Sequence, residues 1–176
     1  MSSTPTLGKG MMIGAWVLLL LLLTLFFGGV LERRTNPNGN PSGRIDDQGV
    51  REVELKRNVQ GHYVASGFIN GYPVTFLVDT GATQVAISEK LAERLGLEKR
   101  GGTFSQTANG VVAVWQTQLD RVRLGVIEQR NVRATILPDL RPWNQVLLGM
   151  SFLKKLELVQ RDGTLLLRQR PSSANP

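Results

Sequence analysis

The stretch FLVDTGAT, residues 76–83, decides the fold of this chain because it places a carboxylate in a tight turn directly after an apolar strand. Asp, Thr and Gly are common turn residues, so Asp79 can simply bind nearby backbone N–H groups. The other interpretation is catalytic: two carboxyls that share one site have their pKa values driven apart, which separates an acid from a base. The motif occurs once, so a two-carboxyl site requires two copies of the chain.

The residues after the turn favour the catalytic interpretation. A second apolar strand, residues 84–87, follows directly, and Ser88 is a good N-cap for a helical run over residues 89–97. This order of apolar strand, turn, strand and short helix resembles the active-site segment of retropepsin-like (retroviral-type) aspartic proteases. The resemblance implies three catalytic residues and one neighbouring substrate-binding residue: Asp79, Thr80 and Gly81, and then Ala82.

Two further segments occur in the order that this family requires. Residues 106–110, QTANG, precede the apolar strand 111–115, and an Asn-Gly pair at such a place predicts a hairpin turn. This hairpin resembles the flap that closes over substrate. The resemblance implies that four of its residues bind substrate: Thr107, Ala108, Asn109 and Gly110.

The second of these segments, residues 146–153 or VLLGMSFL, is similar to the second signature of the family, which packs beside the catalytic turn. Retroviral members usually carry an Arg soon after its Gly, whereas Met150 and Ser151 stand here. The resemblance therefore implies that an ion pair bracing the viral dimer is missing. The match covers about residues 59–167, and its details most resemble bacterial membrane-anchored members.

The remainder of the domain has a period of two, which is typical of half-buried strands. Residues 62–69 and 72–78 flank Asn70-Gly71, and residues 158–159 and 165–167 flank Asp162-Gly163, so both pairs predict hairpins. We therefore predict a mainly β domain, a retropepsin-like acid protease barrel with one or two short helices, preceded by a single transmembrane helix.

The N-terminal part contains residues 11–30, which carry no charge and are rich in Leu. As a helix they would be about 30 Å long, the thickness of the hydrocarbon core of a bilayer. The alternative is a cleaved signal peptide, but no A-x-A-like site follows at residues 26–31. We expect an uncleaved anchor.

The predicted organisation has five parts. A flank at residues 1–10 and a transmembrane helix at 11–30 are followed by a flexible linker at 31–48, which contains TNPNGNPSG and has little apolar content. The protease domain is predicted at 49–170, with a tail at 171–176.

The charges that flank the span do not by themselves decide on which side of the membrane the domain lies. Lys9 lies before it, while Arg33, Arg34 and Arg44 follow it, which leans toward a cytoplasmic domain. The resemblance implies the opposite, a single-pass protein of the bacterial inner membrane with a periplasmic protease domain. We expect the periplasmic arrangement.

Composition excludes several classes of chemistry. The chain has no Cys, and His62 is its single His, so disulfides, thiol catalysis, His-based triads and two-His metal sites are ruled out. We expect neither a metal nor an organic cofactor. The net charge is +7, but no basic run is interleaved with stacking aromatics, so we expect solvated faces and no nucleic-acid partner. A basic face near a bilayer can add weak attraction to anionic headgroups.

Five other residues allow a structural or a functional interpretation. The structural one is favoured for three acidic residues in turn or strand-edge positions: Asp120, Asp139 and Asp162. Trp115 and Trp143 either line a substrate pocket or pack in the core.

The function implied by the resemblance is a membrane-anchored aspartic endopeptidase that cleaves protein or peptide substrates as a homodimer, with Asp79 supplied by each copy. One alternative is a non-catalytic peptide-binding or scaffold module with the same fold. A basic adaptor for membrane surfaces or nucleic acid is the third.

Overall fold

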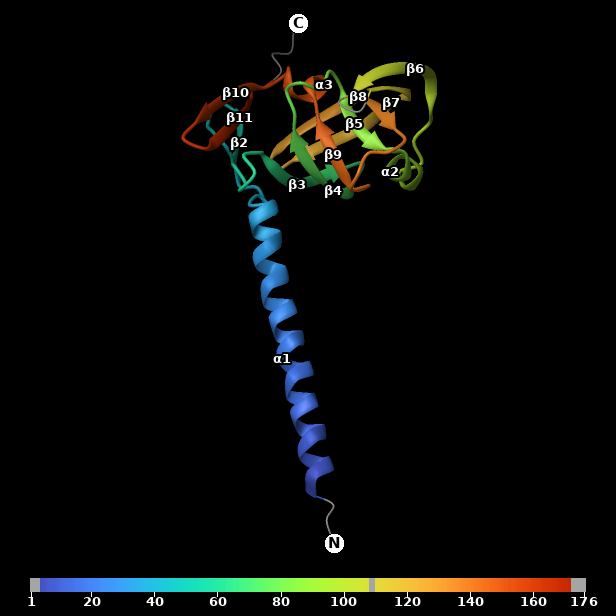
Figure 1. Ribbon diagram of the computed structural model, residues 1–176. Coiled ribbons are helices and arrows are strands. Elements are labelled where there is room, and N and C mark those ends of the chain that lie inside the picture. The colour runs from blue at the N-terminus through green and yellow to red at the C-terminus, as the bar shows by residue number, and fades with distance from the viewer. Residues whose placement is uncertain (1–3, 108–109, 172–176) are drawn as a thin grey trace, which may run out of the picture.

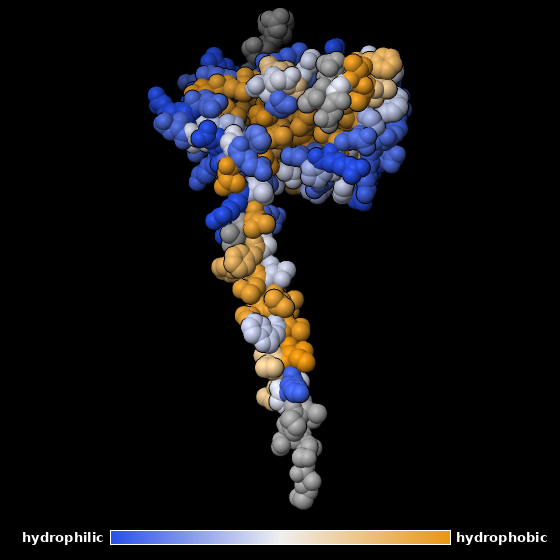
Figure 2. Space-filling model, in the orientation of Figure 1, coloured by the Kyte–Doolittle hydropathy of each residue, from blue (hydrophilic) through white to orange (hydrophobic). Residues whose placement is uncertain are grey.

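A long helix, α1 (Thr4–Thr35), projects from a domain built mainly of β-strands (Figure 1). The computed structural model describes residues 4–107 and 110–171. The large apolar side chains of α1 from Met11 to Phe27, and Leu31, are exposed, and Figure 2 shows the helix as a largely hydrophobic rod. The helix is long and apolar enough to cross a membrane, and it lies near the N-terminus, where signal sequences have the same character.

The larger of two sheets forms the body of the domain. Its strands, in spatial order, are β3 (Val64–Ile69), β4 (Tyr72–Val78), β9 (Gln145–Leu148), β5 (Val85–Ser88), β8 (Ile127–Leu137), β7 (Gly110–Leu124) and β6 (Arg100–Thr107). β3 also pairs with β7, through Phe68 opposite Arg123. The sheet therefore closes on itself and leaves β6 outside as an arm. The predicted mainly β barrel with short helices is confirmed.

The core lies inside this closed sheet, where the strands present alternate residues. Phe76, Ile136, Leu148 and Phe152 are fully buried, and burying each such side chain contributes about 1.5 to 3 kcal/mol. β8 shows the alternation clearly: Val132, Ala134 and Ile136 are buried, as their period of two predicts. The sequence pattern thus specified which face of the strand points inward.

The two predicted hairpins are confirmed. Asn70 and Gly71 have φ values of 51° and 85°, and Asp162 and Gly163 have values of 49° and 78°. Positive φ at both central residues is the type I′ geometry that suits the twist of paired strands, and Asn, Asp and Gly tolerate it best. The β3–β4 hairpin sets the register that brings Val78 to the edge of the barrel.

Two short helices cover the ends of the barrel. In α2 (Glu89–Arg94) the Ser88 hydroxyl accepts a hydrogen bond from the Leu91 N–H at 3.1 Å, which confirms the predicted N-cap. Gly96, with φ of 62°, follows the helix as its stop signal. α3 (Met150–Leu153) follows β9 directly and buries Phe152 and Leu153.

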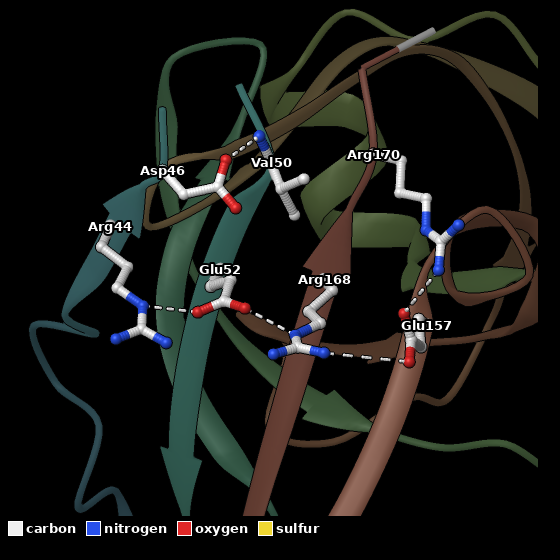
Figure 3. Close-up of polar contacts among 7 residues, drawn as sticks. All are labelled: Arg44, Asp46, Val50, Glu52, Glu157, Arg168 and Arg170. Atoms are coloured by element: carbon white, nitrogen blue, oxygen red, sulfur yellow. Dashed lines mark hydrogen bonds and ion pairs between the residues drawn. The ribbon is translucent and has the colours of Figure 1, made fainter. Parts of the chain in front are cut away.

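The smaller sheet has the order β1 (Gly43–Ile45), β2 (Arg51–Lys56), β11 (Thr164–Gln169) and β10 (Glu157–Arg161). A ladder of charges crosses it (Figure 3). The Glu52 side chain is only 7% exposed and accepts hydrogen bonds from Arg44 and Arg168, each at 2.5 Å. The hydrogen bond from Arg44, and then the one from Arg168, hold the pKa of the Glu52 carboxyl below its usual value of 4.5, against the opposing effect of burial.

The segment at residues 31–48 differs from the flexible linker that its composition predicts. α1 continues to Thr35, residues 43–45 form β1, and Asn38 is buried. The Asn38 Nδ2 donates to the backbone oxygens of Lys56 and Val64, and its Oδ1 accepts from the Lys56 N–H. Side-chain hydrogen bonds to backbone thus order a segment that has few apolar residues.

Replacing Glu52 by Gln should lower the free energy of unfolding at neutral pH, because two Arg partners then face an uncharged group. The folded-state pKa of Glu52 is lowered, so its stabilisation is present above about pH 4.5 and is lost as the pH falls through the folded value. Urea unfolding across acidic to neutral pH should therefore show parent and variant converging in acid. Glu54→Gln, a substitution at an exposed position of the same strand, should change the free energy of unfolding little at any pH. A constant gap between parent and Glu52→Gln would contradict this account.

Candidate active site

The turn that follows β4 holds the predicted carboxylate. Asp79 is half-buried, and its Oδ1 accepts a hydrogen bond from the Gly81 N–H at 2.9 Å. The Asp79 N–H donates to the Leu148 oxygen of β9 at 3.2 Å, and its own backbone oxygen accepts from Ala82. The carboxylate is thus oriented by its own loop, and the backbone that carries it is held by a neighbouring strand.

The second signature segment packs directly against this turn, as predicted. The Met150 N–H donates to the Ala82 oxygen at 2.8 Å, and the Ser151 N–H donates to the Thr83 oxygen at 3.1 Å. A Cβ at Gly149 would lie 2.2 Å from the backbone oxygen of Gln84. Since backbone cannot move aside as a side chain can, only Gly permits this close approach.

Ser151 braces the site within one chain. Its hydroxyl accepts a hydrogen bond from the Val85 N–H at 2.9 Å and donates to the Arg133 oxygen at 2.7 Å. It therefore links the starts of α3 and β5 to β8. Retroviral members of the family that the sequence resembles usually carry an Arg near this position. In this chain Ser151 stands there and supports the fold of the single subunit.

A cleft of about 480 Å³ opens beside the turn. One wall consists of the turn itself, including Asp79, Ala82 and Gln84, and the other of the arm made by β6 and β7. The arm contributes Phe104, whose side chain is 77% exposed, together with others that include Val114 and Gln116. Among the described residues that line this cleft, Asp79 is the only acidic one.

The arm is the predicted flap hairpin. β6 and β7 pair antiparallel up to Thr107 opposite Gly110, which confirms a hairpin at this place. Ala108 and Asn109 lie outside the described residues, so substrate binding by the four predicted flap residues stays a prediction. Phe104 and Gln116 line the cleft without having been predicted as site residues, although the single aromatic residue of the strand RGGTFSQT was a usable signal.

Thr80 and Gly81 are exposed in the single chain. The predicted contact of the Thr80 hydroxyl across a dimer axis involves a second copy, and it stays a prediction. Exposure of these two turn residues leaves them accessible to such a copy. Within residues 4–107 and 110–171, no group of three or more His, Cys, Asp or Glu is placed to hold a metal ion.

The remaining candidates lie away from the cleft. The exposed residues His62, Asp120, Asp139 and Asp162 do not line it, and Asp162 occupies a hairpin turn. Trp143 packs beneath the guanidinium of Arg94, and Trp115 beneath the ammonium of Lys99. Both rings are partly buried against the hydrophobic core and neither lines the cleft, so the packing interpretation holds for both.

Comparisons with known proteins agree with this geometry. Residues 65–155 match the family described as "gag-polyprotein putative aspartyl protease". The crystal structure of a retropepsin-like aspartic protease from Rickettsia conorii is similar, with 30% sequence identity and a TM-score of 0.59 over 74% of this chain and 96% of that one.

Two curated bacterial proteins are also similar, and both are uncharacterized. One, from Sinorhizobium and encoded in the region 5′ of cobV, is 36% identical over 70% of this chain. The other, from Rickettsia prowazekii, is 29% identical over 67% of this chain. The chain spans about half the length of these relatives, 54% and 51%. From the family match and the shared fold, we conclude that the chain belongs to the gag-type aspartyl protease family, with the retropepsin-like fold.

Proposed function

We propose that this chain is a membrane-anchored aspartic endopeptidase that works as a homodimer. The observation that carries the proposal is that Asp79 is the one acidic residue among the described residues lining the cleft, in a turn whose tip is exposed. Aspartic protease chemistry uses two carboxyls that share a proton. A second copy of the same turn, brought against the first, supplies the missing carboxyl.

In this mechanism the two Asp79 carboxyls hold a water molecule between them. The ionised carboxyl takes a proton from the water while the oxygen of the water attacks the scissile carbonyl carbon. The protonated carboxyl donates a hydrogen bond to the carbonyl oxygen. Collapse of the tetrahedral intermediate breaks the carbon–nitrogen bond, and the leaving nitrogen takes up a proton from the dyad. The products are a carboxyl and an amine.

Three features of the turn support these roles. The Gly81 N–H bond to Asp79 Oδ1 orients the carboxyl, and the brace from α3 limits movement of the backbone that carries it. A reacting group held in place by its surroundings needs less reorganisation in the transition state. The exposed Thr80 hydroxyl is proposed to bond across the dimer axis, so that the two carboxyls lie in one plane.

The arm is proposed to close over an extended peptide. Its strands reach out from the barrel, and its exposed Phe104 ring faces the cleft that Asp79 also lines. An extended substrate would gain backbone hydrogen bonds along such a strand, and an arm that covers it would exclude water from the reaction.

The position of the enzyme in the cell is also part of the proposal. α1 is proposed to remain as a single-pass anchor in the bacterial inner membrane, with the domain in the periplasm. The length and apolar character of α1 support a membrane anchor, and the bacterial sources of the relatives support a bacterial membrane. The count of Lys and Arg near the span favours a cytoplasmic domain instead, so the proposal of a periplasmic domain depends on the family resemblance.

Asp79→Asn should reduce peptide hydrolysis by about a thousandfold or more, because it removes general acid–base chemistry and keeps the size of the turn residue. Asp162→Asn is the matched control, since Asn tolerates the positive φ of that distant turn. The measurement is cleavage of a diverse peptide pool by purified full-length protein, with thermal unfolding as a check of the fold. Equal cleavage by parent and Asp79→Asn would refute catalysis and leave the peptide-binding module as the alternative.

Mixing should reveal shared active sites. When Asp79→Asn protein is added to parent in detergent at about threefold excess, random pairing leaves only about a quarter of parent chains in parent homodimers. The specific activity of the parent should fall to about the same fraction. In a separate dilution series, specific activity should fall in detergent but not when vesicles are diluted, because the anchor keeps the chains together in one membrane. Light scattering at the same concentrations reports the oligomeric state. Full activity from a demonstrated monomer would overturn the dyad.

Phe104→Ala should lower kcat/KM for peptides by about tenfold while leaving stability within about 0.5 kcal/mol, because the ring lines the cleft but contributes little to the core. Val111→Ala is the matched control on the same arm, since Val111 is 64% exposed and does not line the cleft. Steady-state kinetics and urea unfolding are the measurements. A larger kinetic effect at Val111 than at Phe104 would show that the arm binds substrate in another way.

A further inference from the structure

One face of the domain lies on the side from which α1 leaves, and we call it the α1-side face. It is centred on α2, the start of β4 and the loop before β9, and α2 lies on this lower side in Figure 1. A shallow groove of about 300 Å³ is lined both by Glu32 and Thr35 of α1 and by Pro142 and Asn144. The loop before β9 is thus a neighbour of the end of α1.

Two cations and two aromatic residues form a cluster on this face. The Arg94 guanidinium carbon lies 4.3 Å from the centroid of the Trp143 ring, and the Lys90 Nζ lies 5.1 Å from it. Arg94 also donates a hydrogen bond to the Tyr72 hydroxyl at 3.0 Å. Lys90 and Arg94 are both exposed, so the cluster presents positive charge to the outside.

Asparagine side chains fasten the end of α1 to the domain. The Asn58 Nδ2 donates to the Thr35 oxygen at 3.0 Å, and the Asn36 Nδ2 donates to the Ser66 hydroxyl at 3.0 Å. Asn38 follows with its bonds to the backbone of β2 and β3. The domain therefore follows α1 without a loose tether, and the α1-side face has a defined height along the helix axis.

That height coincides with the headgroup layer if α1 spans a bilayer, as the proposed function requires. The apolar residues of α1 end at Leu31, and Thr35 lies four residues further, about 6 Å along the axis. The polar layer on each side of the hydrocarbon core is about 5 to 7 Å thick. The α1-side face then begins where lipid phosphates lie.

The charge of this region suits an anionic surface. Five exposed cations lie on α1's last turn, α2 and the loop before β9: Arg33, Arg34, Lys90, Arg94 and Arg141. Four acidic residues lie on the same elements: Glu89, which pairs with Lys99, and Glu32, Glu93 and Asp139, which have no cation partner among the described ion pairs. Figure 2 shows hydrophilic residues gathered along this lower edge of the domain. Trp and Tyr side chains are also favoured at membrane interfaces.

We propose that the α1-side face docks on anionic phospholipid headgroups of the bilayer that α1 spans, with Lys90 and Arg94 as the main contacts. The turn at residues 79–84 lies beside α3, on the side of the domain away from α1 (Figure 1). Docking therefore turns the candidate active site toward the aqueous phase. Its substrates are then segments that stand clear of the bilayer surface rather than segments lying in it.

The absence of Cys makes a site-specific test practical, because a single introduced thiol can be labelled alone. Asn144→Cys places an environment-sensitive fluorophore on the α1-side face, and Lys154→Cys places it after α3 on the far side. The full-length chain is reconstituted in vesicles of phosphatidylcholine, with or without phosphatidylglycerol, that contain a headgroup-attached quencher. We expect quenching at position 144 to be clearly stronger with phosphatidylglycerol than without it, because the spanning helix can tilt and charge decides how closely the face lies to the headgroups. Quenching at position 154 should be weak in both.

Charge variants test the contacts themselves, with the label kept at position 144. Lys90→Glu combined with Arg94→Glu should abolish the phosphatidylglycerol-dependent quenching, since each cation near the surface changes the docking equilibrium by about fivefold. Lys154→Glu with Lys155→Glu makes the same charge change on the far side and should have no effect. Lys90→Arg with Arg94→Lys keeps the charge and should retain docking, which separates lost charge from lost folding. High salt should also release the face.

The outcomes separate this proposal from the proposed function, because the readout does not use peptidase activity. Flotation of the vesicles is measured first, and a chain that fails to float contradicts the anchor and, with it, the docking. A chain that floats but shows equal quenching at position 144 with and without phosphatidylglycerol overturns the docking alone. Quenching that persists in the Lys90→Glu, Arg94→Glu double variant also overturns the docking proposal. So does quenching that a soluble acidic peptide displaces and that does not depend on phosphatidylglycerol, because that result would indicate a protein partner.

Discussion

The contact between the Asp79 turn and the corner from β9 to α3 is the constraint on which the site depends. β4 and β9 run parallel, with Val78 opposite Leu148, so the carboxyl ends of the two strands meet at one edge of the barrel. Gly149 then lets the backbone of α3 reach the turn closely enough for the Met150 N–H to bond the Ala82 oxygen. The position of the carboxylate is therefore set by a segment about seventy residues away, through backbone hydrogen bonds that do not depend on side-chain rotamers.

Outside the barrel, polar side chains add to the apolar packing that the smaller sheet shares with the core through Val53, Leu55 and Leu167. Asn38 orders the segment after α1 by three hydrogen bonds to backbone, and Glu52 joins β1 to β11 through two Arg side chains. Such groups are costly when a partner is lost, because a buried carboxylate or amide is then left unsatisfied. The bonds of Asn38, with those of Asn36 and Asn58, also hold the end of α1 at a fixed place on the domain, and the proposed orientation of the site relative to a bilayer depends on them.

The arm and the barrel differ in what holds them. Val114, at the inner part of the arm, is buried, whereas Phe104 and Val111 further out are exposed. An outer segment with few buried contacts can open at low cost in free energy, while the braced turn beneath it stays in place. That combination suits a site in which a rigid carboxylate faces a cover that admits extended chains.

The sequence by itself determined the local elements: the type I′ hairpins at Asn70-Gly71 and Asp162-Gly163, the cap at Ser88, the alternation of β8, and the long apolar helix. Each depends on residues close together in the chain, whose conformational preferences are strong. The DTGA turn and its order relative to the second signature also indicated the family. Tertiary structure alone decided the order at Asn38, the hydrogen bonds of Ser151 to Val85 and Arg133, and the membership of Phe104 and Gln116 in the cleft. These features depend on partners far away in the chain, and a short stretch of sequence does not specify which distant residues will form its hydrogen bonds and contacts.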